Sequence, residues 1–210
     1  MVNYLFAASP ELPPLPPCLY QYVAGGNGVF VRAERPGLSV VLPVTFLLSA
    51  LRGLAPINPR FNLIERVEAG FVLDMLNLSR QAAPREMLFY LVRRSAWNLI
   101  IPSQVMSSGS VRPNDPFNPN AREALIEVHS HHSMGAFFSA TDDRDETGFR
   151  IYAVLGRIFD RPTLSVRVGV YGHFWQIPAG WVFNLPDGIR DRLKADDVEE
   201  GDAYRYDPID

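Results

Sequence analysis

One stretch of the chain, EVHSHHSMGAFFSATDD (127–143), constrains its structure and chemistry more than any other part. It holds three of the chain's 4 histidines, His129, His131 and His132. His129 and His131 follow an apolar run typical of a β-strand, in which side chains two residues apart share one face. We therefore expect these two imidazoles to converge, whereas His132 points to the other side and is not expected to join them.

A hydrolytic zinc site takes three protein ligands and leaves one position open for water. Asp142 is the candidate third ligand, because SATD reads as the first turn of a helix that brings the chain back after a short excursion. Ser139 lies three residues earlier and faces the same way on that turn. The same Ser-x-x-Asp pattern is also a helix-capping box, which is purely structural, and this alternative stays open. The combined pattern H-S-H-x7-S-x-x-D favours a metal site.

These residues resemble the JAMM (MPN-plus) family of zinc isopeptidases, which includes prokaryotic JAB domains. The signature of that family is a distant glutamate followed by H-[ST]-H-x7-S-x-x-D, and residues 129–142 match every signature position. The resemblance implies a Zn²⁺ ion held by His129, His131 and Asp142, with water as the fourth ligand. It also implies that Ser139 donates a hydrogen bond to the developing oxyanion.

The resemblance further implies a catalytic glutamate at the start of a strand that follows the first helix. The segment AAPREMLFYLVRR offers Glu86 in that position. Glu127 competes for the role of general base, because it shares the strand face of the two converging histidines. The chain departs from the family pattern at Met87 and Leu88, where a Cys-Gly pair is usual, and at His132, where proline is usual.

Within the family, the details HSHH and FFSATDD are most similar to bacterial members encoded beside ubiquitin-activation-like and ubiquitin-like proteins, such as PRTRC system protein A. This similarity implies a zinc metallo(iso)peptidase that cleaves at the C-terminus of a ubiquitin-like protein, with an activating-enzyme-like protein as a further partner. Two alternatives stay open: a non-catalytic MPN-type scaffold, and another zinc hydrolase that acts on small conjugates.

Strand-prone runs outnumber helical ones and do not alternate with them regularly, which predicts an α+β fold. The resemblance adds a central mixed β-sheet flanked by helices. We expect a proline-rich strap and a β-meander (19–45) within residues 1–60, the metalloprotease domain in 61–186, and an acidic tail in 187–210.

A helix is predicted in residues 62–83, where apolar residues recur every three or four positions and Pro84 ends the pattern. The expected apolar stripe consists of Ile64, Val67, Phe71, Met75 and Leu78. Residues 103–121 are rich in proline, serine and asparagine and are expected to form a long loop. Such a loop either shapes a substrate groove or is a mobile surface segment.

Composition narrows the class of protein. The net charge of -3 gives no basic surface for a nucleic-acid backbone, so no nucleic-acid partner is expected. No apolar run approaches the ~20 residues that a membrane span requires, and the N-terminus lacks the pattern of a signal peptide. The single cysteine, Cys18, excludes a disulfide within the chain and favours a reducing, cytoplasmic location.

Overall fold

The computed structural model of the protein describes residues 1–193. They divide into two compact units, one made of residues 1–65, 140–150 and 168–175, the other of the remaining described residues. The predicted boundaries after residues 60 and 186 stay a prediction, and most of the acidic tail lies outside the described residues. Two large sheets and a few helices confirm the α+β class.

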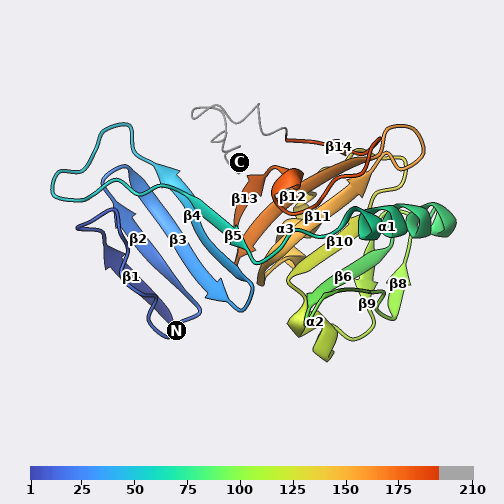
Figure 1. Ribbon diagram of the computed structural model, residues 1–210, viewed down its shortest axis with the longest axis horizontal. Helices are drawn as coiled ribbons and strands as arrows, with labels where there is room; N and C mark the ends of the chain where they lie inside the picture. Colours follow the sequence, from blue (N-terminus) through green and yellow to red (C-terminus); the bar gives the residue numbers. More distant parts are fainter. Residues whose placement is uncertain (194–210) are drawn as a thin grey trace. The chain divides into compact units, whose positions relative to one another are not determined.

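The first sheet has the strand order β1-β2-β3-β4-β5 (Figure 1). Its strands are β1 (Val2–Phe6), β2 (Tyr20–Gly25), β3 (Gly28–Arg35), β4 (Leu38–Phe46) and β5 (Arg60–Leu63). The expected meander is confirmed, because β2, β3 and β4 pair antiparallel in chain order. Gly37 turns the chain between β3 and β4 with a φ of 86°, a value that glycine adopts without strain.

The proline-rich segment 9–18 connects β1 to β2. Because those two strands pair in parallel, the chain must cross over between them instead of turning back in a tight hairpin. The crossover packs on the sheet through Leu12, which contacts a core cluster that includes Val23, Phe30 and Val41. This segment is therefore a strap held against one face of the sheet.

The second sheet is mixed and has the order β13-β12-β11-β10-β6-β7, with β14 paired to β12 (Figure 1). Its strands are β6 (Leu88–Arg93), β7 (Trp97–Ile100), β10 (Ile126–Ser130), β11 (Phe149–Gly156), β12 (Thr163–Val170), β13 (His173–Ile177) and β14 (Arg190–Asp191). Strand β10 runs antiparallel to β6 and parallel to β11. The apolar runs of β11 and β12 are almost wholly buried, as expected for strands covered on both faces.

The apolar run 164–177 does not form one continuous strand, because β12 and β13 are two strands joined by a tight turn. Tyr171 and Gly172 form the turn with φ values of 49° and 91°. Positive φ at both central residues is the geometry of a type I′ hairpin turn, which matches the twist of paired strands.

Helix α1 (Ala69–Ala82) is shorter than predicted. Residues Arg60–Leu63 pair with β4 as β5, so the expected first turns of the helix are a strand, and Ile64 is 63% exposed. The buried face of α1 is formed by Val72, Met75, Leu76 and Ser79, in place of most of the predicted stripe. Pro84 follows the end of the helix as predicted, because a proline disfavours helical geometry in the residue before it.

The expected long loop at 103–121 contains regular structure. Strands β8 (Gln104–Met106) and β9 (Val111–Pro113) pair as a hairpin, and α2 (Pro119–Glu123) follows. Asn118 caps α2 by accepting a hydrogen bond from the Ala121 amide, with a proline at the first helical position.

Among residues 1–193, no helix is long and apolar enough to cross a membrane. The remaining helices are α3 (Ala140–Asp145) and the short 3-10 helix η1 (Ala179–Trp181).

Candidate metal centre

His129 and His131 lie at the carboxyl end of β10, between β6 and β11. Both side chains are buried, with 8% and 5% of their surfaces exposed. Because they are two residues apart they project from the same face, and their Nε2 atoms are 3.1 Å apart. Two imidazole nitrogens bound to one tetrahedral zinc at ~2.0–2.1 Å would lie about 3.3–3.4 Å apart. The observed separation suits a shared ion.

Asp142 completes the group from the first turn of α3. One ligand atom from each of His129, His131 and Asp142 lies within 4.8 Å of the other two, and the carboxylate is partly exposed. Two imidazole nitrogens and one carboxylate oxygen form a donor set that suits zinc. The fold therefore brings together the three side chains that the sequence nominates, and they could bind a metal ion.

The ring of His131 is oriented for this purpose by the excursion that follows it. Its Nδ1 atom lies 3.2 Å from the carbonyl oxygen of Gly135. A carbonyl oxygen only accepts hydrogen bonds, so Nδ1 carries the hydrogen and the lone pair of the neutral ring is on Nε2. Metal-binding histidines are commonly oriented by such a second hydrogen bond, so this contact is consistent with the donor set fitting a metal.

The excursion, residues 132–137, is fixed to the end of β11 by backbone contacts. Arg157 N donates to Met134 O, and Ile158 N donates to His132 O. A Cβ atom added to Gly156 would lie 2.4 Å from Ala136 N and 2.5 Å from Gly135 C. Only glycine permits this approach without a backbone shift, so Gly156 lets the excursion lie directly against β11.

His132 does not belong to the cluster, as the sequence predicts. Its Nε2 atom lies 3.1 Å from Ser108 O, in the turn between β8 and β9. Its φ of 23° is rare for a residue other than glycine. Proline, which is restricted to a φ of about −65°, does not fit this backbone. The departure from the family pattern at this position therefore has a conformational reason.

Glu86 lies two residues before the start of β6, the strand that neighbours β10. The β10–β6 register pairs His129 with Leu88, and Ser130 N donates to Met87 O one residue further along. Extending that register places Glu86 opposite His131, where antiparallel partners have Cβ atoms about 4.5–5.5 Å apart on one face. Glu86 is only 3% exposed, whereas a glutamate near the start of a strand is usually exposed to solvent.

Residues 69–169 match the family model for prokaryotic homologues of the JAB domain. This part of the chain is a JAB domain. The match covers α1, β6, the cluster and most of β12, and so contains every candidate site residue. No curated protein matches the chain. The closer likeness to PRTRC system protein A stays a prediction.

In the JAB domain, three successive backbone amides hold the segment around Glu86. Glu86 N donates to Ser107 O at 2.8 Å and Met87 N to the Ser130 hydroxyl at 2.9 Å. Leu88 N donates to Gln104 Oε1 at 2.7 Å. Ser130 is fully buried. Its hydroxyl takes the place of the backbone carbonyl that would accept a hydrogen bond from the Met87 amide in a regular antiparallel ladder. The β8–β9 hairpin and β10 thus hold the backbone of Glu86 from two sides.

Glu127, the competing base, lies on β10 opposite Tyr90 and Tyr152 and is partly exposed. It shares the strand face of the cluster histidines, as predicted. It lies two residues from His129, about 6.6 Å along the strand, and about twice as far from His131. A residue directly across the ladder is closer than that, so the register favours Glu86 as the neighbour of the cluster.

The sequence did not identify the groups that support the JAB site. The Gly135 carbonyl, Gly156, Gln104 and the hydroxyl of Ser130 are all absent from the predicted set. A glycine at the end of a buried strand is a usable signal, because it often marks a close backbone approach. The pairing of Gln104 with β6 has no signal in the sequence, because it depends on the β8–β9 hairpin.

Proposed function

We propose that this protein is a zinc-dependent metallo(iso)peptidase that cleaves a peptide or isopeptide bond, at the C-terminus of a ubiquitin-like protein. One observation carries the proposal: two converging imidazoles and a carboxylate, with ligand atoms within 4.8 Å of one another, lie inside a JAB domain. The ubiquitin-like substrate, an activating-enzyme-like partner and a cytoplasmic location are supported by the family resemblance.

His129, His131 and Asp142 are the proposed zinc ligands. A zinc ion bound by these residues would lower the pKa of its bound water towards ~7 and would polarise the carbonyl of the scissile bond. The Gly135 carbonyl keeps His131 in the tautomer that presents Nε2. Burial of both rings removes competing water from the nitrogen atoms, and the partly exposed Asp142 leaves the solvent side for substrate.

Glu86 is the proposed general base. Its carboxylate accepts a proton from the attacking water and then delivers that proton to the leaving amine nitrogen. Burial beside His131 and the three anchored amides keep the carboxylate in place. The hydroxyl of Ser139, immediately before α3, donates a hydrogen bond to the carbonyl oxygen as negative charge develops there; one such donor is worth about 3 kcal/mol.

The deciding experiment measures zinc content and hydrolysis on the same preparations. The substrates are linear fusions and isopeptide-linked conjugates of ubiquitin-like proteins, with a small conjugate as a third class. We expect Glu86→Gln to keep its zinc and to lose about 10²–10⁴-fold in turnover, whereas Glu127→Gln remains active. The reverse result for the two glutamates would make Glu127 the base.

The same preparations test the alternatives. Zinc binding without turnover of any fusion or conjugate would contradict the peptidase. A protein that purifies without zinc, and whose melting temperature zinc does not change, would instead support a non-catalytic scaffold. Turnover of the small conjugate alone would assign another hydrolase activity to the same site.

A further inference from the structure

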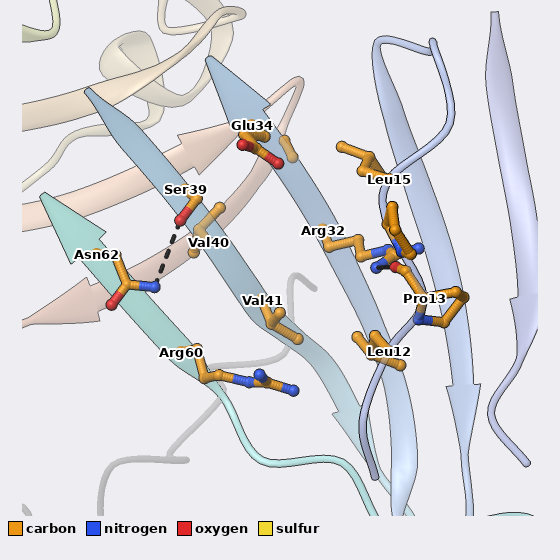
Figure 2. Close-up of a pocket in the computed structure, with 12 residues that line it drawn as sticks. Leu12, Pro13, Leu15, Arg32, Glu34, Ser39, Val40, Val41, Arg60 and Asn62 are labelled. Atoms are coloured by element: carbon orange, nitrogen blue, oxygen red, sulfur yellow. Dashed lines mark hydrogen bonds between the residues drawn. The ribbon is translucent and has the colours of Figure 1, made fainter. Parts of the chain in front are cut away.

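A hollow of about 220 Å³ lies between the strap and the five-stranded sheet (Figure 2). We call it the Arg32 pocket. The strap forms one wall, and β3, β4 and β5 form the other. The lining residues that matter for binding are Leu12, Pro13, Leu15, Arg32, Glu34 and Arg60. None of them belongs to the JAB domain, and neither the motif nor the proposed peptidase accounts for this pocket.

Arg32 is the unusual residue of this pocket. Its side chain is only 7% exposed, although arginine is rarely buried without a carboxylate partner. Its Nε donates to Gln21 Oε1 at 2.8 Å and its Nη1 to the Pro13 carbonyl at 2.6 Å. Within residues 1–193, the buried Nη2 has no hydrogen-bond partner. The Arg32 guanidinium is thus held by two neutral oxygens, and its Nη2 remains available as a hydrogen-bond donor.

The charges around the pocket leave this cation uncompensated. Arg60 adds a second positive charge from β5, and Glu34 supplies the single negative charge of the lining. Glu34 is exposed to solvent, which weakens its attraction to a buried guanidinium. Burial lowers the pKa of Arg32 from its ordinary value, yet an arginine stays charged at neutral pH. The lining therefore carries one net positive charge, on a surface that is more polar than apolar.

The size and walls of the pocket restrict what it can hold. Pockets for drug-sized ligands measure roughly 300–1,000 Å³, so this one suits a group about as large as one amino acid. Leu12, Leu15 and Val41 offer apolar contact, and Figure 2 shows Arg32 lying beside Pro13 of the strap. A guanidinium forms charge-assisted hydrogen bonds with a carboxylate or with a phosphate, so net charge must separate the two. A phosphate dianion matches the single net charge less well.

We propose that the Arg32 pocket binds a carboxylate monoanion carried on a small apolar group. The carboxylate accepts hydrogen bonds from Arg32 Nη2 and from Arg60, and the apolar group lies against the strap. Because Nη2 is itself covered, residues 12–15 must shift as the ligand enters. The site is independent of the proposed peptidase, and its ligand is either a free organic acid or the C-terminus of a peptide.

The test uses the full chain and follows the backbone amides of Leu12 and Leu15 and the Nε–H of Arg32 by NMR. N-acetyl-leucine is the probe, and N-acetyl-leucinamide is its uncharged match. We expect saturable shifts with the acid below about 10 mM and none with the amide. A leucine-terminated peptide with a free C-terminus is then compared with N-acetyl-leucine. Tighter binding of the peptide would identify the natural ligand as a peptide C-terminus, and weaker binding would identify it as a free organic acid.

Three variants separate recognition of charge from folding. Arg32→Met should weaken binding of the acid by about tenfold or more, because a charge-assisted hydrogen bond is lost. Arg60→Gln alters an exposed side chain and should weaken binding of the acid several-fold. Glu34→Gln, also exposed, should strengthen it, because it removes the only negative charge of the lining.

Several results would overturn the proposal. Equal shifts with the acid and the amide would show that the carboxylate is not recognised. Tighter binding of inorganic phosphate than of N-acetyl-leucine would show that the ligand class is wrong. Binding unchanged in both Arg60→Gln and Glu34→Gln would place the acid elsewhere, even if Arg32→Met fails to fold.

Discussion

Two clusters of buried polar groups, one in each sheet, differ in how their hydrogen bonds and charges are satisfied. In the seven-stranded sheet, two imidazoles face each other, and Nδ1 of His131 lies beside a backbone carbonyl. In the five-stranded sheet, Arg32 brings a full positive charge under the strap and is held only by neutral oxygens. The first cluster has gathered electron-pair donors, and the second has a surplus of hydrogen-bond donors.

This difference indicates what each cluster would bind. Converging lone pairs attract a cation, whereas a buried guanidinium with an unused N–H attracts an anion. The two clusters also differ in how firmly the surrounding backbone is held. The backbone around the JAB cluster is held by contacts from β6, β11 and the β8–β9 hairpin, whereas the Arg32 pocket is covered by a strap. We therefore expect mutations that move the backbone of β6, β11 or the β8–β9 hairpin to disturb the JAB cluster.

The largest effect is expected when one member of the JAB cluster is removed. His131→Ala deletes one of the three proposed ligands and should weaken zinc binding at least about 100-fold, which zinc analysis after dialysis against a mild chelator would detect. His173→Ala is the matched control, because this histidine lies on β13 outside the cluster. Equal zinc in the two variants would contradict a metal centre at this position.

Gly156→Ala tests whether the frame of the excursion is as rigid as its contacts suggest. The added Cβ would meet three backbone atoms at 2.4–2.7 Å, so either the excursion or β11 must move. We expect a loss of about 2–3 kcal/mol in the free energy of unfolding, measured by denaturant titration, together with weaker zinc binding. Gly70→Ala, where the new Cβ meets nothing within 4 Å, should cause no loss. Equal stability of the two variants would show that the excursion is pliable.

Ser130→Ala tests the anchoring of Glu86 without altering any candidate ligand. The Met87 N–H loses its acceptor in a fully buried position, which typically costs about 1–3 kcal/mol. Turnover should fall more than zinc affinity, because the displaced group, Glu86, is the proposed base and not a proposed ligand. Ser95→Ala, at an exposed position, serves as the control. If zinc content falls while turnover per bound zinc is unchanged, Ser130 supports the ligands instead.

The smallest effect is expected in the unit that contains the five-stranded sheet, at His173. Its Nε2 lies 2.8 Å from the Tyr22 hydroxyl, and burial lowers its pKa from 6.5. A histidine with a lowered pKa in the folded state contributes full stability above pH 6.5 and progressively less as the pH falls below that value. Wild type should lose slightly more thermal stability than His173→Gln between pH 7.5 and 5.5. Identical losses would show that this histidine is not coupled to folding.

The sequence was informative where the chemistry is local. Two histidines on alternate positions of a strand must share a face, so their convergence follows from strand geometry alone. The meander followed from its turn residues, such as Gly37. The start of α1 could not be predicted from periodicity, because residues 60–63 gain more from pairing with β4 than from continuing an apolar stripe.

The remaining features depend on tertiary contacts that no local pattern encodes. The β8–β9 hairpin reads as loop because it lies in a segment rich in serine, proline and asparagine. Its role beside Glu86 appears only when Ser107 accepts from the Glu86 amide and Gln104 accepts from the Leu88 amide. The buried state of Arg32 depends on the strap, and the strap depends on the parallel pairing of β1 with β2. An isolated arginine within a strand gives no sign of this burial.

The close approach at Gly156 has a consequence for how this domain can be redesigned or can diverge. The backbone of residues 134–136 has no freedom to be remodelled while β11 keeps its place. Beside this fixed backbone, Met134 is 37% exposed, whereas the ring of Phe137 packs edge-on against the ring of His131 with 5.0 Å between centroids. Substitution of Met134, with Gly156 and Phe137 kept, would alter the surface next to the candidate metal centre without removing the contact to His131.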